Sequence, residues 1–133
     1  MSGTPKASYS VLLVDDDRFL LDMYTMKFKE SGCTVEANPD PAKALEKLRG
    51  GVTPDIVLLD VVMPSMTGFE LLEAVRKENL AKDTVFIMLS NQGQQEDLDT
   101  ATRLGAAGYI IKASSIPSEV LERALNIAKE HKK

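Results

Sequence analysis

Short apolar runs alternate with longer segments whose apolar residues recur at helical spacing, along almost the whole chain. A short apolar run bounded by turn-forming residues is typical of a buried parallel strand. We expect five such strands, at about residues 10–14, 34–37, 56–59, 85–89 and 107–111, each followed by a helix. Strands that alternate with helices form βαβ units, so the pattern predicts an α/β fold built on a parallel sheet.

Polar residues mark where several of the helices should begin. Asp17 is a candidate cap for the first helix, and Asp40 with Pro41 supplies a cap and a first-turn proline for the second. Thr67 and Glu70 have the spacing of a capping box, so the third helix should begin there. The side chains that we expect to face the core are Leu20, Met23, Tyr24 and Phe28, then Ala44, Leu45 and Leu48, then Phe69, Leu72 and Val75, then Leu98, Ala101 and Leu104, and finally Leu121, Leu125 and Ala128.

Composition limits the classes to which the protein can belong. With 133 residues, 44% of them hydrophobic, the chain is about one domain long, and we expect a domain over residues 9–131 behind a flexible segment at 1–8. The net charge of −4 argues against direct nucleic-acid binding. No apolar stretch approaches the ~20 residues of a membrane span. The start also has no apolar signal segment, so we expect a cytoplasmic protein without membrane association.

Charged and hydroxyl side chains stand where four of the predicted strands end. Asp15 and Asp16 follow the first strand, Asp60 the third, Ser90 the fourth and Lys112 the fifth. Open α/β sheets bind ligands outside the carboxyl ends of their strands, so we expect these side chains to converge. Carboxylates that lie close together repel one another unless a cation is present, and Mg²⁺ prefers oxygen ligands of this kind. The sequence therefore predicts a magnesium site.

The same groups fit the transfer of a phosphoryl group to a carboxylate. Asp60 can act as the nucleophile, because aspartyl phosphates are established products of carboxylate attack. A metal held by Asp15, Asp16 and Asp60 would neutralise charge that develops on the phosphoryl oxygens. Lys112 would supply a compact cation for another phosphoryl oxygen, and Ser90 would donate one hydrogen bond.

In these motifs the chain resembles the receiver domains of response regulators, the phosphoacceptor half of bacterial two-component signalling. The resemblance rests on Val14-Asp15-Asp16, on Leu59-Asp60-Val61-Val62-Met63-Pro64 with Gly68, on Ser90, and on Tyr109-Ile110-Ile111-Lys112. It covers about residues 9–131. It implies a flavodoxin-like, doubly wound sheet of five parallel strands in the order 2-1-3-4-5, with five helices.

The resemblance also implies a donor and a metal. Asp60 would accept its phosphoryl group from a histidine kinase or a phosphotransfer protein. Mg²⁺ would be held by Asp15, Asp16 and Asp60 together with the backbone carbonyl of Val62. The chain would not be an enzyme with a separate substrate, since it would assist only its own phosphorylation and dephosphorylation.

A switch is the third implication of the resemblance. Ser90 and Lys112 would contact the phosphoryl oxygens, Ser90 would move toward the phosphate, and Tyr109 would turn inward into the space that this leaves. The fourth helix, fifth strand and fifth helix would then present an altered surface to a protein target that the sequence does not identify. We expect a monomer, or a weak dimer on phosphorylation.

The chain departs from the family pattern beside two site residues. Lys112 is followed by Ala113, where proline is usual, and Ser90 by Asn91, where a small residue is usual. A cis bond before a residue other than proline costs ~3 kcal/mol, so we predict a trans Lys112–Ala113 bond. Val62 and Asn91 flank the expected phosphate, and because Val62 offers nothing to orient an attacking water, we predict a comparatively long-lived phosphoryl group.

Two alternatives come from other classes of protein. A haloacid-dehalogenase-like phosphatase also uses an aspartyl phosphate and magnesium, but its second acid, two residues after the nucleophile, is replaced here by Val62. A flavodoxin-like cofactor carrier would need a glycine-rich phosphate loop, which the sequence lacks. Within the receiver interpretation, a stand-alone regulator that acts by docking and a fragment of a longer multidomain regulator both stay open.

Overall fold

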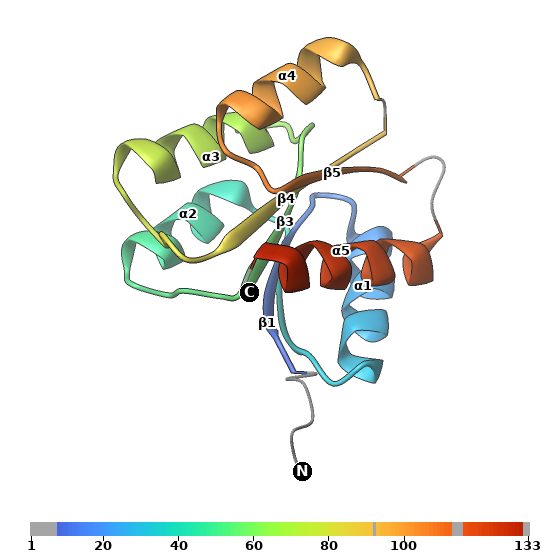
Figure 1. The fold of residues 1–133 in the computed structure, drawn as a ribbon. Helices are drawn as coiled ribbons and strands as arrows, with labels where there is room; N and C mark the ends of the chain where they lie inside the picture. Colours follow the sequence, from blue (N-terminus) through green and yellow to red (C-terminus); the bar gives the residue numbers. More distant parts are fainter. Residues whose placement is uncertain (1–7, 92, 113–115, 132–133) are drawn as a thin grey trace.

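A parallel sheet forms the centre of the molecule in the computed structural model, which describes residues 8–91, 93–112 and 116–131 (Figure 1). Its five strands are β1 Ser10–Val14, β2 Thr34–Asn38, β3 Ile56–Asp60, β4 Val85–Ser90 and β5 Gly108–Ile111. They are hydrogen-bonded in the order β2-β1-β3-β4-β5, and every neighbouring pair is parallel. The predicted fold class and strand order are confirmed.

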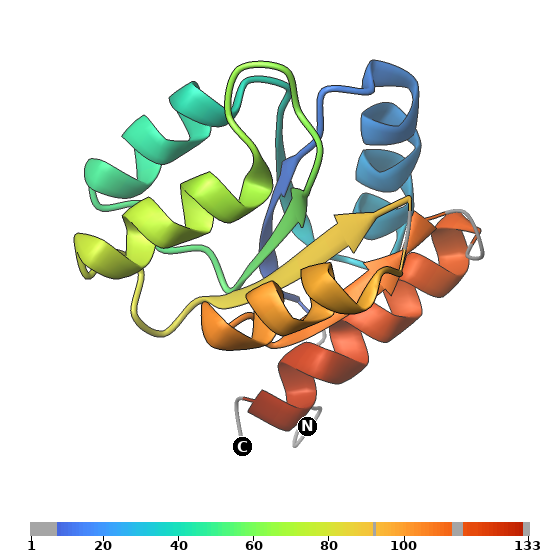
Figure 2. The same cartoon turned by 90° about the horizontal axis from the view of Figure 1, so that it is seen from above.

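Helices cover both faces of this sheet. They are α1 Arg18–Glu30, α2 Pro41–Arg49, α3 Gly68–Lys77, α4 Gln95–Arg103 and α5 Pro117–His131. Side chains of α1 and α5 pack into one hydrophobic cluster, and those of α2, α3 and α4 into a second on the opposite face (Figures 1 and 2). Because each strand crosses to the next through a helix, all five carboxyl ends lie at the same edge of the sheet.

The predicted caps set the starts of three helices. Asp17 and Asp40 each accept a hydrogen bond from a backbone N–H in the first turn of the helix that follows. Thr67 and Glu70 form the reciprocal capping box at α3. These bonds satisfy donors that have no partner within the helix, so local sequence decides where α1, α2 and α3 begin.

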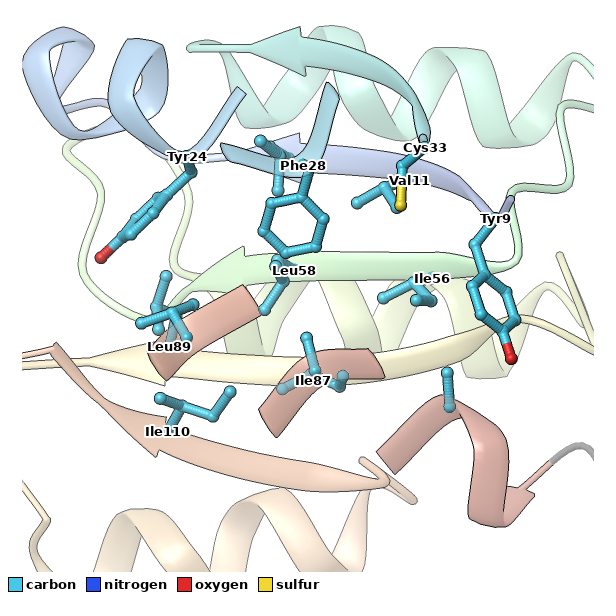
Figure 3. Close-up of a cluster of buried hydrophobic side chains, with 14 of the residues drawn as sticks. Tyr9, Val11, Tyr24, Phe28, Cys33, Ile56, Leu58, Ile87, Leu89 and Ile110 are labelled. Carbon is cyan, nitrogen blue, oxygen red and sulfur yellow. The ribbon is translucent and has the colours of Figure 1, made fainter. Parts of the chain in front are cut away.

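The inward face of α5 differs from the prediction at two positions, each shifted by one residue, while Ala128 is buried as predicted. Val120, Ala124 and Ala128 are the buried residues of this helix, whereas Leu121 and Leu125 are only partly buried. Small side chains on the contact row let α5 lie close to the sheet, and the two leucines pack beside that row. Figure 3 shows the cluster beneath α1 and α5.

Similar shifts occur in α1 and α3. Leu21 and Leu71 are buried although neither was predicted to be, and Leu20, Met23 and Phe69 are partly exposed. An apolar stripe on a helix is wider than one row of side chains, so its most buried row depends on tertiary packing that the sequence pattern does not resolve.

Some predictions concern residues outside those that the structure describes. The segment 1–8, apart from Ser8, is one of them, and the Lys112–Ala113 bond is another, because residues 113–115 are not described. Among the helices of the described ranges, none is long and apolar enough to cross a membrane.

Candidate functional site

The strand register brings two predicted acids together at the carboxyl edge of the sheet. Val14 of β1 lies opposite Leu59 of β3, so Asp15 leaves the sheet level with Asp60. Gly68, the first residue of α3, packs against the backbone of Asp60, and a Cβ at this position would overlap the Asp60 carbonyl oxygen. The start of α3 can therefore approach the strand end only because residue 68 is glycine.

Three carboxylates gather at this edge. Ligand oxygens of Asp15, Asp16 and Asp60 all lie within 4.8 Å of one another. Asp15 and Asp60 are buried, while Asp16 is exposed. The cluster thus has a buried floor and one side open to solvent.

Lys112 joins the two buried acids. Its Nζ lies 2.8 Å from Oδ2 of Asp15 and 3.2 Å from Oδ1 of Asp60, and its side chain is only 7% exposed. Oδ1 of Asp15 accepts a hydrogen bond from the backbone N–H of Asp17 at 2.9 Å. Oδ2 of Asp15 is fully buried and accepts no hydrogen bond of regular geometry from the described residues, so the ion pair with Lys112 is what compensates it.

The pKa values of Asp60 and Lys112 indicate that the site holds more negative charge than Lys112 neutralises. Burial, followed by repulsion from Asp15, raises the pKa of Asp60 to about 7, although Lys112 acts in the opposite direction. Burial by itself lowers the pKa of Lys112, but contacts with Asp15 and Asp60 outweigh it and raise that pKa above its usual value. Lys112 therefore stays protonated, and Asp60 is only partly ionised near neutral pH.

Ser90 and Tyr109 form a second group beside the acids. Ser90 is buried at the end of β4, opposite Ile111 of β5, and Lys112 follows at the next position. Burial raises the pKa of Tyr109, a hydrogen bond with Ser90 lowers it, and the nearby carboxylate of Asp97 raises it. Tyr109 therefore connects the strand end that carries Ser90 with the first turn of α4.

Comparison with known proteins decides the family. Residues 11–125 match the family described as the response regulator receiver domain. The chain belongs to this family. It is 32% identical over 108 residues to the regulator of RpoS of Escherichia coli K12, which covers 81% of this chain and 31% of the relative. It is 30% identical over 123 residues to the response regulator SaeR of Staphylococcus aureus, which covers 92% of this chain and 52% of that protein.

Solved receiver structures have the same fold. The chemotaxis protein CheY4 of Vibrio cholerae superposes with a TM-score of 0.82 at 31% identity, covering 91% of this chain and 99% of that one. A CheY-like receiver domain protein of Methanospirillum hungatei superposes with a TM-score of 0.81 at 28% identity, covering 92% and 95%. The predicted family is confirmed, and this receiver spans about a third to a half of the curated relatives named above.

The donor set of the receiver fits a hard divalent cation. All three clustered ligands are carboxylates, and oxygen donors of this kind suit Mg²⁺. The raised pKa of Asp60 indicates negative charge that one lysine does not offset. A divalent cation at the open side of Asp16 would supply the missing charge.

Two further predicted residues, Val62 and Asn91, are exposed and lie close in sequence to Asp60 and Ser90. Val62 follows Asp60 by two positions, and its side chain is 70% exposed. Asn91 is exposed directly after Ser90. The roles predicted for the Val62 carbonyl, for Tyr109 as a switch and for Asn91 at the phosphate stay predictions.

One residue near the receiver site was missed. Tyr24 was predicted only as a core residue of the first helix, and its ring is indeed buried. Its hydroxyl points away from the cluster toward the carboxyl edge of the sheet (Figure 3). Burial raises the pKa of Tyr24, the charge of Lys112 lowers it, and those of Asp15 and Asp60 raise it. Helical periodicity identifies such a residue as internal, but it does not show how far a tyrosine hydroxyl reaches.

Proposed function

We propose that this receiver is a phosphorylation-activated signalling switch. It takes a phosphoryl group onto Asp60 from a histidine kinase or a phosphotransfer protein, in the cytoplasm. One observation carries the proposal: the carboxylate of Asp60 lies at the strand end beside two further acids, with Nζ of Lys112 3.2 Å from its Oδ1. This arrangement offers a nucleophile, a cation and a metal-binding set in one place.

In the proposed reaction the Asp60 oxygen that is not paired with Lys112 attacks the phosphorus atom of the donor. An O–P bond forms, the P–N bond of the donor phosphohistidine breaks, and its electron pair stays on the imidazole nitrogen. Asp60 must be ionised to attack. Burial and Asp15 raise its pKa to about 7, which disfavours the ionised carboxylate. Lys112 and a bound cation act in the opposite direction and favour the ionised form that attacks.

Lys112 and Ser90 would hold the transferred group. Lys112 already reaches both buried acids, and a phosphoryl oxygen on Asp60 would offer its Nζ a new partner. Ser90 lies buried at the neighbouring strand end, where its hydroxyl would donate to another phosphoryl oxygen.

Asp15, Asp16, Asp60 and the carbonyl of Val62 would hold Mg²⁺. When bound, the ion would neutralise charge on the phosphoryl oxygens. Asp15 is positioned for this role by the N–H of Asp17, and exposed Asp16 completes the ligand set from the solvent side. We propose that the chain assists only its own phosphorylation and dephosphorylation, because the acceptor is its own side chain.

The output would pass through α4, β5 and α5. Tyr109 of β5 hydrogen-bonds with Ser90 and lies near Asp97 of α4, so a shift of Ser90 toward the phosphate would release Tyr109 to turn inward. The altered surface would then bind a protein target, with the receiver as a monomer or as a weak dimer on phosphorylation.

The proposal is tested by phosphoryl uptake from acetyl phosphate with Mg²⁺, measured by intact-protein mass spectrometry. Wild-type protein should take up one phosphoryl group, and Asp60→Asn none. Asp22→Asn is the matched control, because Asp22 is an exposed aspartate of α1. Equal uptake by Asp60→Asn and wild type would refute the proposed function.

A further inference from the structure

Arg76, in the last turn of α3, binds the far end of α4. Its Nε donates to the carbonyl of Leu104 at 2.9 Å, and its Nη2 donates to the carbonyl of Gly105 at 2.9 Å. Its Cζ also lies 5.2 Å from the ring centroid of Phe86, a buried residue of β4. A planar guanidinium can make two directed bonds and a ring contact at once, and an ammonium group cannot.

Backbone bonds fasten the same end of α4. The N–H of Ala106 donates to Ala101 at 2.9 Å, and the N–H of Ala107 donates to the carbonyl of Phe86 in β4 at 2.7 Å. Gly105 has a φ of +81°, which ends the helix in a left-handed turn. A cation at a helix C-terminus is also favoured by the helix dipole, so Arg76 stabilises this end both by direct bonds and by its charge.

The N-terminal end of α4 lies beside the proposed switch residues. The side chain of Gln94 does not cap the helix, and residues 93–96 are exposed. Ala101, in the C-terminal half, is the one buried residue of α4, and every residue of this helix is described. Asp97, in the first turn, hydrogen-bonds with Tyr109 of β5. The two proposed switch residues, Ser90 and Tyr109, therefore act at the end of α4 opposite to the one that Arg76 holds.

We propose that Arg76 is the pivot of α4. It holds the C-terminal end of the helix against α3 and β4, so that a rearrangement at Ser90 and Tyr109 swings the N-terminal end rather than shifting the whole helix. Figures 1 and 2 show α4 along the β4–β5 half of the sheet, on the same face as α3. Arg76 is a positioning residue. The swing rests on the proposed function, whereas the anchoring of the resting helix does not.

Anchoring is tested on resting protein by amide hydrogen exchange, followed by NMR. In Arg76→Ala, exchange at residues 102–106 should rise about tenfold, the effect expected when hydrogen bonds to a charged donor are lost. Arg76→Lys keeps the charge but not the paired bonds, and should give an intermediate rise. If Arg76→Ala does not fold, Arg76→Lys alone tests the anchoring.

Arg49→Ala is the matched control for anchoring. Arg49 makes two hydrogen bonds to Glu78, at 2.8 and 2.7 Å, which connect α2 with the end of α3 and do not involve α4. This variant loses the same charge and the same number of bonds. If residues 102–106 exchanged no faster in Arg76→Ala and Arg76→Lys than in Arg49→Ala, the pivot would be refuted.

The swing is tested by adding beryllofluoride and Mg²⁺ as a phosphoryl mimic. In wild type, amide chemical-shift changes should be large at residues 95–99 and small at 102–106, and in Arg76→Ala they should spread to both ranges. Equal changes at both ends of wild-type α4 would overturn the swing. A wild-type protein that responded nowhere would instead refute the proposed function, and the resting exchange data would still decide the anchor.

Discussion

The two ends of β3 each carry an aspartate, and their surroundings differ. Asp55 comes just before the strand, where its Oδ2 accepts hydrogen bonds from the backbone N–H and the hydroxyl of Ser10, at 2.9 and 3.2 Å. Its own N–H donates to the Ser10 hydroxyl at 2.9 Å. Asp60 ends the strand, where it shares the single cation of Lys112 with Asp15. Ser10 donates two hydrogen bonds to the first carboxylate, while the second lies in a cluster with excess negative charge.

This difference separates a structural polar group from a reactive one. Hydrogen bonds to a partly buried carboxylate stabilise a fold, as at Asp55. Burial of like charges costs free energy, and here the pKa of Asp60, raised to about 7, reports that cost. Asp55 therefore stabilises the fold. Asp60 destabilises it, and the same burial places its carboxylate where it can bind a cation and accept a phosphoryl group.

Removal of the shared cation should have the largest effect. We predict that Lys112→Met lowers the initial rate of phosphoryl uptake from acetyl phosphate by about 100-fold or more, because charge that develops on the phosphoryl oxygens loses its fixed partner. Lys82→Met is the control, since Lys82 is an exposed lysine near the opposite edge of the sheet. Equal rates for Lys112→Met and wild type would show that Lys112 only neutralises its neighbours.

Asp55 and Asp60, at the two ends of β3, should change the free energy of unfolding in opposite directions when they are substituted. Without divalent cations at pH 7.5, Asp60→Asn should raise the free energy of unfolding by ~2 kcal/mol, since it removes a buried like charge but also one ion pair. Asp55→Ala should lower it by ~2 kcal/mol, because the Ser10 donors lose their acceptor. Urea denaturation measures both changes.

The pH dependence of the free energy of unfolding tests whether ionised Asp60 destabilises the fold. The pKa of Asp60 is about 7 in the folded state, above the ~3.9 of an unfolded aspartate, so the native state binds more protons between these values. Its contribution to stability is therefore complete below pH ~4 and is lost as pH rises through about 7. Asp60→Asn should remove this slope. A wild-type slope of the opposite sign in this window, absent from Asp60→Asn, would contradict the account.

Magnesium should offset the repulsion among the acids at the Asp60 end of β3. Millimolar Mg²⁺ should stabilise wild type by ~1 kcal/mol or more, because it binds the native cluster and not the unfolded chain. Asp16→Ala should lose this gain, and Asp22→Ala, which changes an exposed acid of α1, should keep it. The melting temperature reports the effect, and a wild-type value indifferent to magnesium would argue against the site.

Val62 should affect only the lifetime of the phosphoryl group. Its exposed side chain cannot orient water, so we predict a comparatively long-lived phosphoprotein. Val62→Asn should shorten the half-life by roughly 2- to 10-fold, less than the ~10²-fold contribution of a complete general base. Rapid loss of the phosphoryl group from wild type, unchanged or slower in Val62→Asn, would contradict this prediction.

Much of the fold could be predicted because local rules decide it. The capping box at Thr67 and Glu70 sets the start of α3, and apolar runs that end in polar residues place the strands and the acids of the site. The most buried row of α5 could not be predicted, since Val120 and Ala124 compete with Leu121 and Leu125 for the sheet and only tertiary packing decides between them.

The individual side-chain contacts between distant segments also could not be predicted from the sequence. The sequence predicted that Lys112 would converge with the acids, but it did not indicate that its Nζ pairs with Asp15 and Asp60 at once, or that the hydroxyl of Tyr24 points to the same edge. The bonds from Arg76 to the end of α4 are of the same kind. Such contacts depend on the geometry of several elements together, whereas residue spacing reports one element at a time.

Localisation of the phosphoryl group tests the central claim most directly. After incubation with acetyl phosphate and Mg²⁺, borohydride reduction converts an aspartyl phosphate into homoserine, and peptide mass spectrometry then locates the converted residue. We predict conversion at Asp60 and at no other aspartate. Conversion at Asp15, Asp16 or Asp55, with Asp60 unchanged, would contradict it.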